Sequence, residues 1–272
     1  MNGIQHGGLS FESKCSGSAQ DGGFPRHMHE AYELYYFLEG DADYVVGDKL
    51  YPLAPHTLLL IRPAVYHFPV LHAEAPYRRM VLNFTEELVP APLVPVLRAA
   101  DVSRRAPPAG RLGQLFAGAE RAAQHYAEAD ALLALRESLT LILLELKYET
   151  PAREDGADVL HPRLGEVLRH IDAHLAEPMS VTELAAAFFV SPSWLTHTFA
   201  QYLHIGVMQY VNSKKILRAQ QLIRAGMPPT QAAQECGFSG YSTFFRLYRS
   251  ILGTSPAQDK RPPDAPSFGG ER

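Results

Sequence analysis

Four side chains in the first quarter of the chain have the types and spacing of a metal-ligand set. His27 and His29 stand two residues apart, Glu33 follows four residues later, and His67 comes after an interval with room for two strands. Imidazole nitrogens combined with a carboxylate suit Fe, Mn, Ni or Zn. The pattern therefore makes these four residues a candidate site for a divalent metal ion.

The same residues suit two other roles, and the sequence leaves the choice open. They could hydrogen-bond to a small effector without any metal, with Tyr35 beside them, or they could be polar residues with no ligand role. The last role is disfavoured, because burying unpaired polar groups inside a small barrel is costly. Aromatic rings combined with a few polar groups would suit a sugar or an aromatic acid as the effector.

The elements that must position these side chains are short strands. Residues 24–85 contain aromatic and β-branched runs separated by turn residues and prolines, which predicts a small β-sandwich or barrel. The expected strands are 35–38, 44–46, 58–61 and 79–82. Because His27, His29, Glu33 and Tyr35 all have odd numbers, they would face one side of a single continuous strand. We assign residues 1–110 to this barrel, including a Pro/Ala-rich connector at 90–110.

A helical segment is expected at 111–150. Six apolar residues recur there at spacings of three and four and define one helix face: Leu132, Leu135, Leu139, Ile142, Leu143 and Leu146. That face could pack on the barrel, form a dimer seam, or do both. The next residues, 151–160, contain charged residues, proline and glycine, and predict a linker between domains.

Composition places the chain among soluble, cytoplasmic proteins. Hydrophobic residues make up 46% of the chain, and Cys15 and Cys236 lie too far apart in sequence to indicate a disulfide framework. We expect no signal peptide and no membrane span, because the longest apolar stretch is too short to cross a bilayer. A nucleophile elbow, a phosphate loop and a dinucleotide fingerprint are all missing from the sequence, so we expect no enzyme.

Residues 161–261 form the pattern of two helix-turn-helix units in tandem. In the first, a capping box begins at Ser180, and Ser191 followed by proline starts a second helix after a tight turn. The pattern returns about 48 residues later, with Gly237 in the turn and Gly253 at the end of the last helix. Residues 178–261 carry eight basic and three acidic residues, a net charge of +5 in a chain of net charge −4, which suits a nucleic-acid backbone.

At these residues the chain resembles the AraC/XylS-type transcriptional regulators. The run Gly237-Phe-Ser-Gly-Tyr-Ser-Thr-Phe-Phe-Arg246 and the later Gly253-Thr-Ser-Pro256 are similar to the family signature, and Ser191-Pro-Ser-Trp-Leu195 is similar to its first unit. The resemblance covers roughly residues 160–261. The chain departs from the pattern in having His204 in place of a glycine, Lys215 in place of an arginine, and Pro229 and Ala232 where branched apolar residues are common.

The resemblance implies that each unit places its second helix in the major groove of double-stranded promoter DNA. The outward-facing residues expected to contact DNA are Ser193, Trp194, Thr196, His197, Gln201, Tyr241, Ser242, Thr243, Arg246 and Arg249. Arg246 is the candidate for a bidentate contact with guanine, whereas Arg249, Lys214 and Lys215 would bind phosphates or stabilise their own domain. A homodimer, a small-molecule effector and RNA polymerase are further partners that the resemblance implies.

The histidine spacing, followed by Gly40, resembles the cupin family and the effector domain of many AraC-type regulators, although Ala64 and Leu71 stand where cupins favour glycine and asparagine. We therefore expect an α+β chain: an N-terminal cupin-like β-barrel with a helical dimerisation segment, an all-α tandem helix-turn-helix domain at 161–261, and a disordered tail at 262–272. The expected function is effector-responsive transcription regulation. The alternatives are a metal-dependent cupin oxygenase or isomerase with an accessory DNA-binding domain, and a constitutive regulator whose barrel only dimerises.

Overall fold

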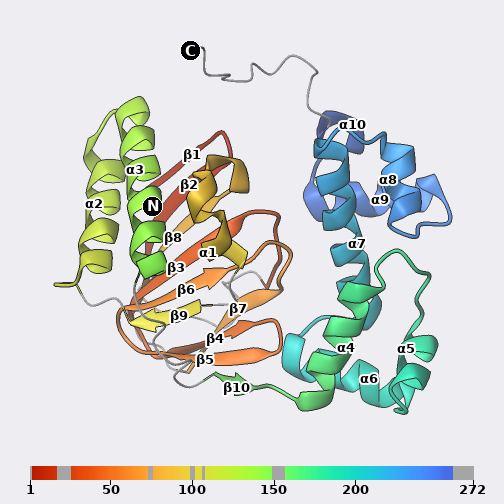
Figure 1. The fold of residues 1–272 in the computed structure, drawn as a ribbon. Helices are drawn as coiled ribbons and strands as arrows, with labels where there is room; N and C mark the ends of the chain where they lie inside the picture. Colours follow the sequence, from red (N-terminus) through yellow and green to blue (C-terminus); the bar gives the residue numbers. More distant parts are fainter. Residues whose placement is uncertain are drawn as a thin grey trace. The chain divides into compact units, whose positions relative to one another are not determined.

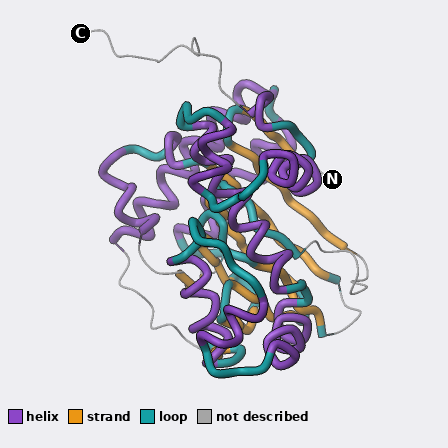
Figure 2. The backbone as a smooth tube through the Cα atoms, turned by 90° about the vertical axis from the view of Figure 1, so that its right-hand side faces the viewer, coloured by secondary structure: helices purple, strands orange, loops and turns teal. Residues whose placement is uncertain are grey.

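The computed structural model describes residues 2–16, 26–72, 76–98, 102–105, 108–148 and 157–259. The chain divides into two compact parts, Met1–Leu160 and His161–Arg272, which we call the barrel part and the helical part. Most of the expected linker, 151–156, and the expected disordered tail, 262–272, lie outside the described residues. The fold belongs to the α+β class, as predicted, with all the described strands in the barrel part (Figure 1, Figure 2).

Two antiparallel sheets build the barrel part. The first has the order β1-β2-β8-β3-β6-β9 and the second the order β10-β5-β4-β7. The strands of the first sheet are β1 (Asn2–His6), β2 (Leu9–Ser16), β8 (Tyr77–Phe84), β3 (Tyr32–Glu39), β6 (Thr57–Ile61) and β9 (Val102–Arg105). Those of the second are β10 (Asp158–Val159), β5 (Lys49–Leu53), β4 (Ala42–Val46) and β7 (His67–Leu71). The four expected strands fall within β3, β4, β6 and β8.

Strand β3 lies between β8 and β6 and is buried on both faces. Tyr35 and Phe37 point into the core shared with the second sheet, while Leu34 and Tyr36 point to the other side, into the core under the helices. Burial on both faces explains why this strand is a continuous apolar run rather than an alternating one. Glu33 is the charged exception, buried with 4% of its surface exposed.

Two helices, α2 (Arg111–His125) and α3 (Glu128–Tyr148), lie side by side on one face of the first sheet (Figure 1). Five of the six residues in the expected apolar face of α3 are buried in the core beneath: Leu135, Leu139, Ile142, Leu143 and Leu146. The face predicted at 111–150 therefore packs on its own barrel. These five buried side chains are therefore unavailable for the alternative role of the face as a dimer seam.

The expected connector and linker contain more structure than their composition predicts. Within 90–110, η2 (Ala91–Leu93) leads into α1 (Val94–Arg98), and β9 pairs with β6; a further 3-10 turn, η1 (Glu86–Leu88), precedes them. At the end of the predicted linker, β10 pairs with β5, so residues 158–159 belong to the barrel part. Backbone pairing of this kind leaves little trace in residue types, because it uses groups that every non-proline residue has.

The helical part contains the two predicted helix-turn-helix units joined by a long helix. Its elements are α4 (Pro162–Ala173), α5 (Val181–Ala187), α6 (Pro192–Thr198), η3 (Phe199–Leu203), α7 (Val207–Arg224), α8 (Pro229–Glu235), α9 (Tyr241–Leu252) and α10 (Pro256–Asp259). Helices α5 and α6 form the first unit and α8 and α9 the second, with α7 running between them (Figure 1). Among the described residues, no helix combines the length and the apolar character needed to cross a membrane.

Candidate functional site

A backbone contact with His67 places His27 in the candidate metal-ligand set, whereas the sequence predicts that a shared strand does so. Strand β3 begins only at Tyr32, so His27, His29 and Glu33 do not share one continuous strand. Instead the backbone of His27 pairs with that of His67. The His27 N–H donates to the His67 carbonyl at 3.3 Å, and the His67 N–H donates to the His27 carbonyl at 3.0 Å. Residues directly opposite each other in an antiparallel pair face the same side, which brings the two imidazoles together.

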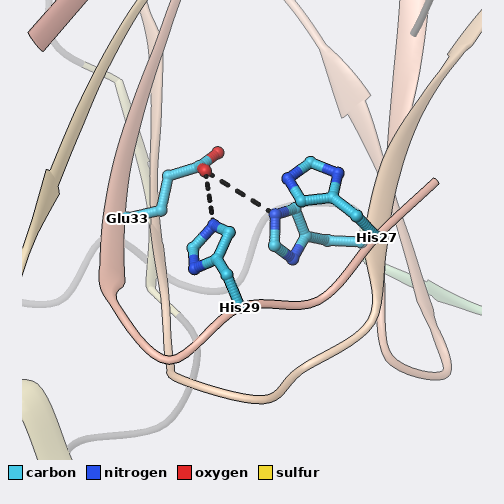
Figure 3. A group of neighbouring side chains, drawn as sticks. His27, His29 and Glu33 are labelled. Atoms are coloured by element: carbon cyan, nitrogen blue, oxygen red, sulfur yellow. Dashed lines mark hydrogen bonds and ion pairs between the residues drawn. The ribbon is translucent and has the colours of Figure 1, made fainter. Parts of the chain in front are cut away.

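The four predicted side chains converge. Their ligand atoms all lie within 4.8 Å of one another, and the imidazole centroids of His27 and His67 are 4.5 Å apart. The Oε2 atom of Glu33 lies 3.1 Å from Nε2 of His29 and 3.6 Å from Nε2 of His67. Figure 3 shows His27, His29 and Glu33 pointing toward a common centre. The structure thus joins residues from well-separated parts of the sequence.

Backbone carbonyls orient two of the imidazoles. The Nδ1–H of His29 donates to the carbonyl of Ala31 at 3.0 Å, and that of His67 donates to the carbonyl of Val65 at 2.8 Å. A neutral imidazole has a single N–H, so these hydrogen bonds leave Nε2 of each ring with a lone pair directed at the centre of the cluster. Metal-bound histidines in proteins are held in the same way.

The centre of the cluster requires a positive charge. Glu33 and His67 are almost fully buried, and Nε2 of His67 has no hydrogen-bond partner in the described part of the chain. Burial alone would raise the pKa of the Glu33 carboxyl, but protonated His67 and His29 beside it would hold that pKa well below its usual range. A carboxylate facing lone pairs of buried imidazoles is stable only with a cation between them, either a proton or a metal ion.

The dimensions of the cluster fit a metal ion. Ligand atoms about 2.1 Å from a metal lie about 3.4 Å apart in a tetrahedron and about 4.2 Å apart across an octahedron. Separations of at most 4.8 Å therefore need only a small contraction. Three imidazoles and a carboxylate also offer more lone-pair ligand atoms than one shared proton can bind. The cluster comes nearest to solvent at His29, whose side chain is 26% exposed, against 5% for Glu33 and 1% for His67.

Tyr44, rather than Tyr35, is the tyrosine that contacts the cluster directly. The Tyr35 hydroxyl is fully buried and hydrogen-bonded to the Tyr77 hydroxyl. Tyr44 is the tyrosine next to the cluster: its hydroxyl donates to Oε1 of Glu33 at 3.4 Å, and its ring lies against that of His67. Burial raises the pKa of Tyr44 well above its ordinary value, so the phenol stays protonated and can donate. From the sequence, Tyr44 is a strand residue and one of several aromatic residues that could line a pocket, without an assigned partner.

Ala64 occupies a turn that favours glycine. Its φ is +59°, in the left-handed region, and its N–H donates to the carbonyl of His29 at 2.7 Å. This turn thus links the segment around His29 to the segment that leads to His67. The cupin-type preference for glycine at this position has a direct reason, because only glycine adopts a positive φ without cost.

The two helices of the first unit begin, and the last helix of the second unit ends, as the sequence predicts. The Ser180 hydroxyl accepts a hydrogen bond from the Glu183 N–H at 3.2 Å, which caps α5, and the Ser191 hydroxyl accepts from the Trp194 N–H at 3.1 Å, which caps α6. Helix α9 ends at Gly253 with φ of +70°. Each cap needs only residues within one turn, which is why local sequence predicts it.

The residues expected to contact DNA are exposed, with one exception. Ser193, Thr196, His197 and Gln201 lie on the outer face of α6 and η3, and Tyr241, Ser242, Thr243, Arg246 and Arg249 on that of α9. Trp194 is half-buried, with its ring against that of His161 at 5.5 Å. The apolar sides of the same helices are buried, through Leu195 and Phe199 in the first unit and Phe244 and Tyr248 in the second.

Two turns around α6 have non-glycine residues in the left-handed region. His204, where the family has glycine, has φ of +53° at the end of η3. Phe189, in the turn between α5 and α6, also has φ of +53°, and 95% of its surface is exposed. The positive φ at position 204 explains why the family has glycine there. Both helices of the first unit form in spite of these two turn residues.

The basic residues of the helical part divide into two groups. Lys214 and Lys215 are buried: Lys214 pairs with Asp172 at 2.6 Å, and Lys215 donates to the carbonyl of Glu177 at 2.8 Å. Of the two roles predicted for these lysines, the structure supports stabilisation of their own domain. Arg246 and Arg249 remain exposed on α9. The positive charge available to DNA on the two recognition helices is therefore concentrated on the second.

Two family models match the chain in succession. The AraC-like ligand-binding domain matches residues 15–137, and a helix-turn-helix domain matches residues 184–261. A ligand-binding barrel followed by helix-turn-helix units defines a class, the HTH-type transcriptional regulators. The chain belongs to the AraC family of these regulators, as the sequence predicts.

Relatives match either most of the chain or its last third. The uncharacterized HTH-type transcriptional regulator YfiF of Bacillus subtilis is 25% identical over 241 residues, which cover 85% of this chain and 76% of YfiF. The regulator GbdR of Pseudomonas aeruginosa is 32% identical over 101 residues, covering 37% of this chain and 28% of GbdR. Among solved structures, wild-type ToxT of Vibrio cholerae with bound unsaturated fatty acid is 12% identical, with a TM-score of 0.39 over 93% of this chain and 95% of ToxT.

Proposed function

We propose that this chain is a transcription regulator that binds promoter DNA through α6 and α9 and senses a small molecule through the barrel. The observation that supports the DNA-binding role is the pair of recognition helices, each with a polar exposed face and a buried apolar face. The cationic face of α9 would supply most of the attraction to phosphates, and the neutral face of α6 would contribute contacts to bases.

Arg246 tests this role. A planar guanidinium matches the O6 and N7 atoms of guanine in the major groove. We expect Arg246→Ala to weaken binding to the specific operator by about 1–3 kcal/mol while changing binding to random DNA much less. Arg249→Ala is the matched control: as a phosphate contact, it should weaken both by a similar factor and reduce the salt dependence. Equal losses on both DNAs for Arg246→Ala, measured by fluorescence anisotropy, would refute its base contact.

The barrel site is proposed to hold a divalent metal ion. His27, His29, Glu33 and His67 would hold it, and the ion would supply a Lewis-acidic position at which an anionic or hydroxyl-bearing effector can be bound. The exposed side of the cluster, at His29, offers a route for that effector. Tyr44 would orient Glu33 through its hydrogen bond. A sugar or an aromatic acid has the required oxygen atoms.

The same four residues could serve a metal-dependent oxygenase or isomerase. The relatives of this chain are transcriptional regulators, and this favours sensing over catalysis as the use of the site. We propose a cytoplasmic regulator without enzymatic activity, which acts on RNA polymerase at the promoter. Turnover of a candidate effector by the metal-loaded chain, lost in His27→Ala, would favour the enzyme instead.

A homodimer is proposed through the outer face of α3. Leu133 and Tyr148 expose 61% and 77% of their surface there, and Leu144 lies between them on the same side of the helix. The neighbouring Arg136 and Glu137 carry opposite charges. When two copies of a helix face pair antiparallel, apolar residues meet and such charges can lie opposite each other.

Leu133→Glu tests this interface. We expect the substitution to place a buried charge in the apolar seam of each subunit and to convert the dimer into a monomer, as measured by light scattering. Val159→Glu, which is also an exposed apolar residue of the barrel part but lies on β10, should leave the dimer intact. A dimer that persists in Leu133→Glu at micromolar concentration would exclude this face.

A further inference from the structure

The turn of the second helix-turn-helix unit touches the backbone of the segment that leads into the first. Gly237, between α8 and α9, has φ of +71°, and a Cβ atom there would overlap the carbonyl oxygen of Ala176, in the connection between α4 and α5. The two residues are far apart in sequence, yet no side chain fits between them. Glycine is therefore required here for close approach as well as for its backbone conformation.

A buried lysine lies beside this contact. Lys215, on α7, is only 5% exposed. Its ammonium donates to the carbonyl of Glu177 at 2.8 Å and would lie 2.9 Å from a Cβ on Gly237. The ring of Phe238 lies 5.9 Å from the same Nζ atom. A single ammonium thus contacts the segment before α5 and the turn before α9 at once, in surroundings of low polarity where such interactions are strong.

The preceding lysine anchors α7 in a second direction. Lys214 pairs with Asp172, in the last turn of α4, at 2.6 Å. Adjacent residues of a helix point about 100° apart, so the two lysines fix α7 against rotation about its own axis. Helix α7 also packs through Ile216, Ala219 and Ile223 against the core of the second unit. The direction of α9 therefore follows that of α7.

We propose that the contact of Gly237 with Ala176, together with Lys214 and Lys215, forms a clamp that sets the separation and angle of the two recognition helices. These residues are then positioning residues for the spacing of the two DNA segments that the protein reads. The inference rests on the proposed DNA-binding function. Two segments read on one face of the duplex lie about one helical turn apart, and each added base pair moves the second by about 3.4 Å and rotates it by about 34°.

The test measures preference for spacing. Specific sites are selected from random DNA with the full-length wild-type protein, and the two recognised segments are then moved apart or together by one and two base pairs. The wild-type protein is expected to lose roughly tenfold or more in affinity at the wrong spacing, because one unit loses its base contacts. For Gly237→Ala we expect less than about threefold loss, since a clamp that is forced open lets the units adjust independently.

Gly253→Ala is the matched control. Gly253 has φ of +70°, almost equal to that of Gly237, but a Cβ there meets nothing within 4 Å. Both substitutions carry the same backbone strain, so the contacts with Ala176 and Lys215 distinguish them, and Gly253→Ala should keep the wild-type spacing preference. If Gly237→Ala does not fold, as judged by circular dichroism, Lys215→Met carries the same expectation, because it keeps the length of the side chain and removes the donor to Glu177.

The outcomes separate the two proposals. If the wild-type protein selects no sequence, the proposed function fails, and the inference fails with it. If it selects a two-segment site but tolerates every spacing, or if the clamp variants keep its sharp preference, the clamp alone is refuted. A flattened preference in Gly237→Ala or Lys215→Met, with Gly253→Ala unchanged, supports the clamp. A mere loss of stability would lower affinity at all spacings alike and would not produce this pattern.

Discussion

His67→Ala is expected to remove the stabilisation that a bound metal ion gives to the barrel part. At a zinc concentration about 100 times the dissociation constant, the wild-type protein should gain about 2.7 kcal/mol, which raises the melting temperature by about 5–10 °C for a part of this size. Loss of one ligand should weaken binding at least about 100-fold, since even outer partners of a metal site are worth up to that much. The gain then falls below about 0.5 kcal/mol at the same zinc concentration.

The readout is the difference between the melting temperatures with and without metal. His67→Ala also destabilises the metal-free protein, because it leaves Glu33 buried with one partner fewer. His72→Ala is the control, since His72 is an exposed histidine near the end of the same strand, paired with Asp43 at 2.9 Å outside the cluster. It should leave the metal-induced shift unchanged. Equal shifts in the wild-type protein and His67→Ala, with Zn, Mn, Ni and Fe(II) each tested, would rule out the metal site.

The sequence predicted which residues gather at this site but not how they do so. The prediction relied on odd numbering along one strand, and that strand does not exist before Tyr32. The residues converge because the backbone of His27 pairs with that of His67 and because a turn at Ala64 holds the segment around His29. Both are long-range backbone contacts, which are not encoded in the spacing of residues. The sequence names Tyr44 only as one of several possible pocket-lining aromatic residues, and its hydrogen bond to Glu33 could not be predicted for the same reason.

Strands without a distinctive composition were also missed. β1 and β2 pair with each other and β2 pairs with β8, so they form one edge of the first sheet. Only Leu9 and Phe11 of β2 are fully buried, and two apolar residues among polar ones give a weak signal. β3, in contrast, is buried on both faces, and its apolar run made it easy to predict.

The helical part was predicted better, because its signals are local. Caps, turn glycines and the apolar faces of α4 to α9 need only neighbours within a turn or two. The burial of two lysines could not be predicted from local sequence. In sequence, Lys214 and Lys215 belong to a basic segment that suits DNA, and only the contacts with Asp172 and Glu177 reveal that they are buried within the domain.

Asp259→Ala is expected to destabilise the helical part by about 2–4 kcal/mol. The carboxylate of Asp259 accepts from Tyr248 at 2.8 Å, from Gln220 at 3.0 Å and from Arg224 at 3.1 Å, and so joins α10 to α9 and α7. Tyr248 and Gln220 are buried, and removing the acceptor of a buried donor costs about 1–3 kcal/mol each. The exposed Arg224 adds little, because solvent screens its charge.

The chain provides a direct probe for this measurement. Trp194 is its single tryptophan and lies in the helical part, so its fluorescence during urea unfolding reports on that part separately from the barrel. Glu235→Ala, which removes an exposed carboxylate from α8, should shift the transition by less than about 0.5 kcal/mol. Asp259→Asn should fall between the two, because the amide oxygen can still accept one of the hydrogen bonds. An unfolding midpoint for Asp259→Ala equal to that of Glu235→Ala would show that these three hydrogen bonds do not hold α10 to the domain.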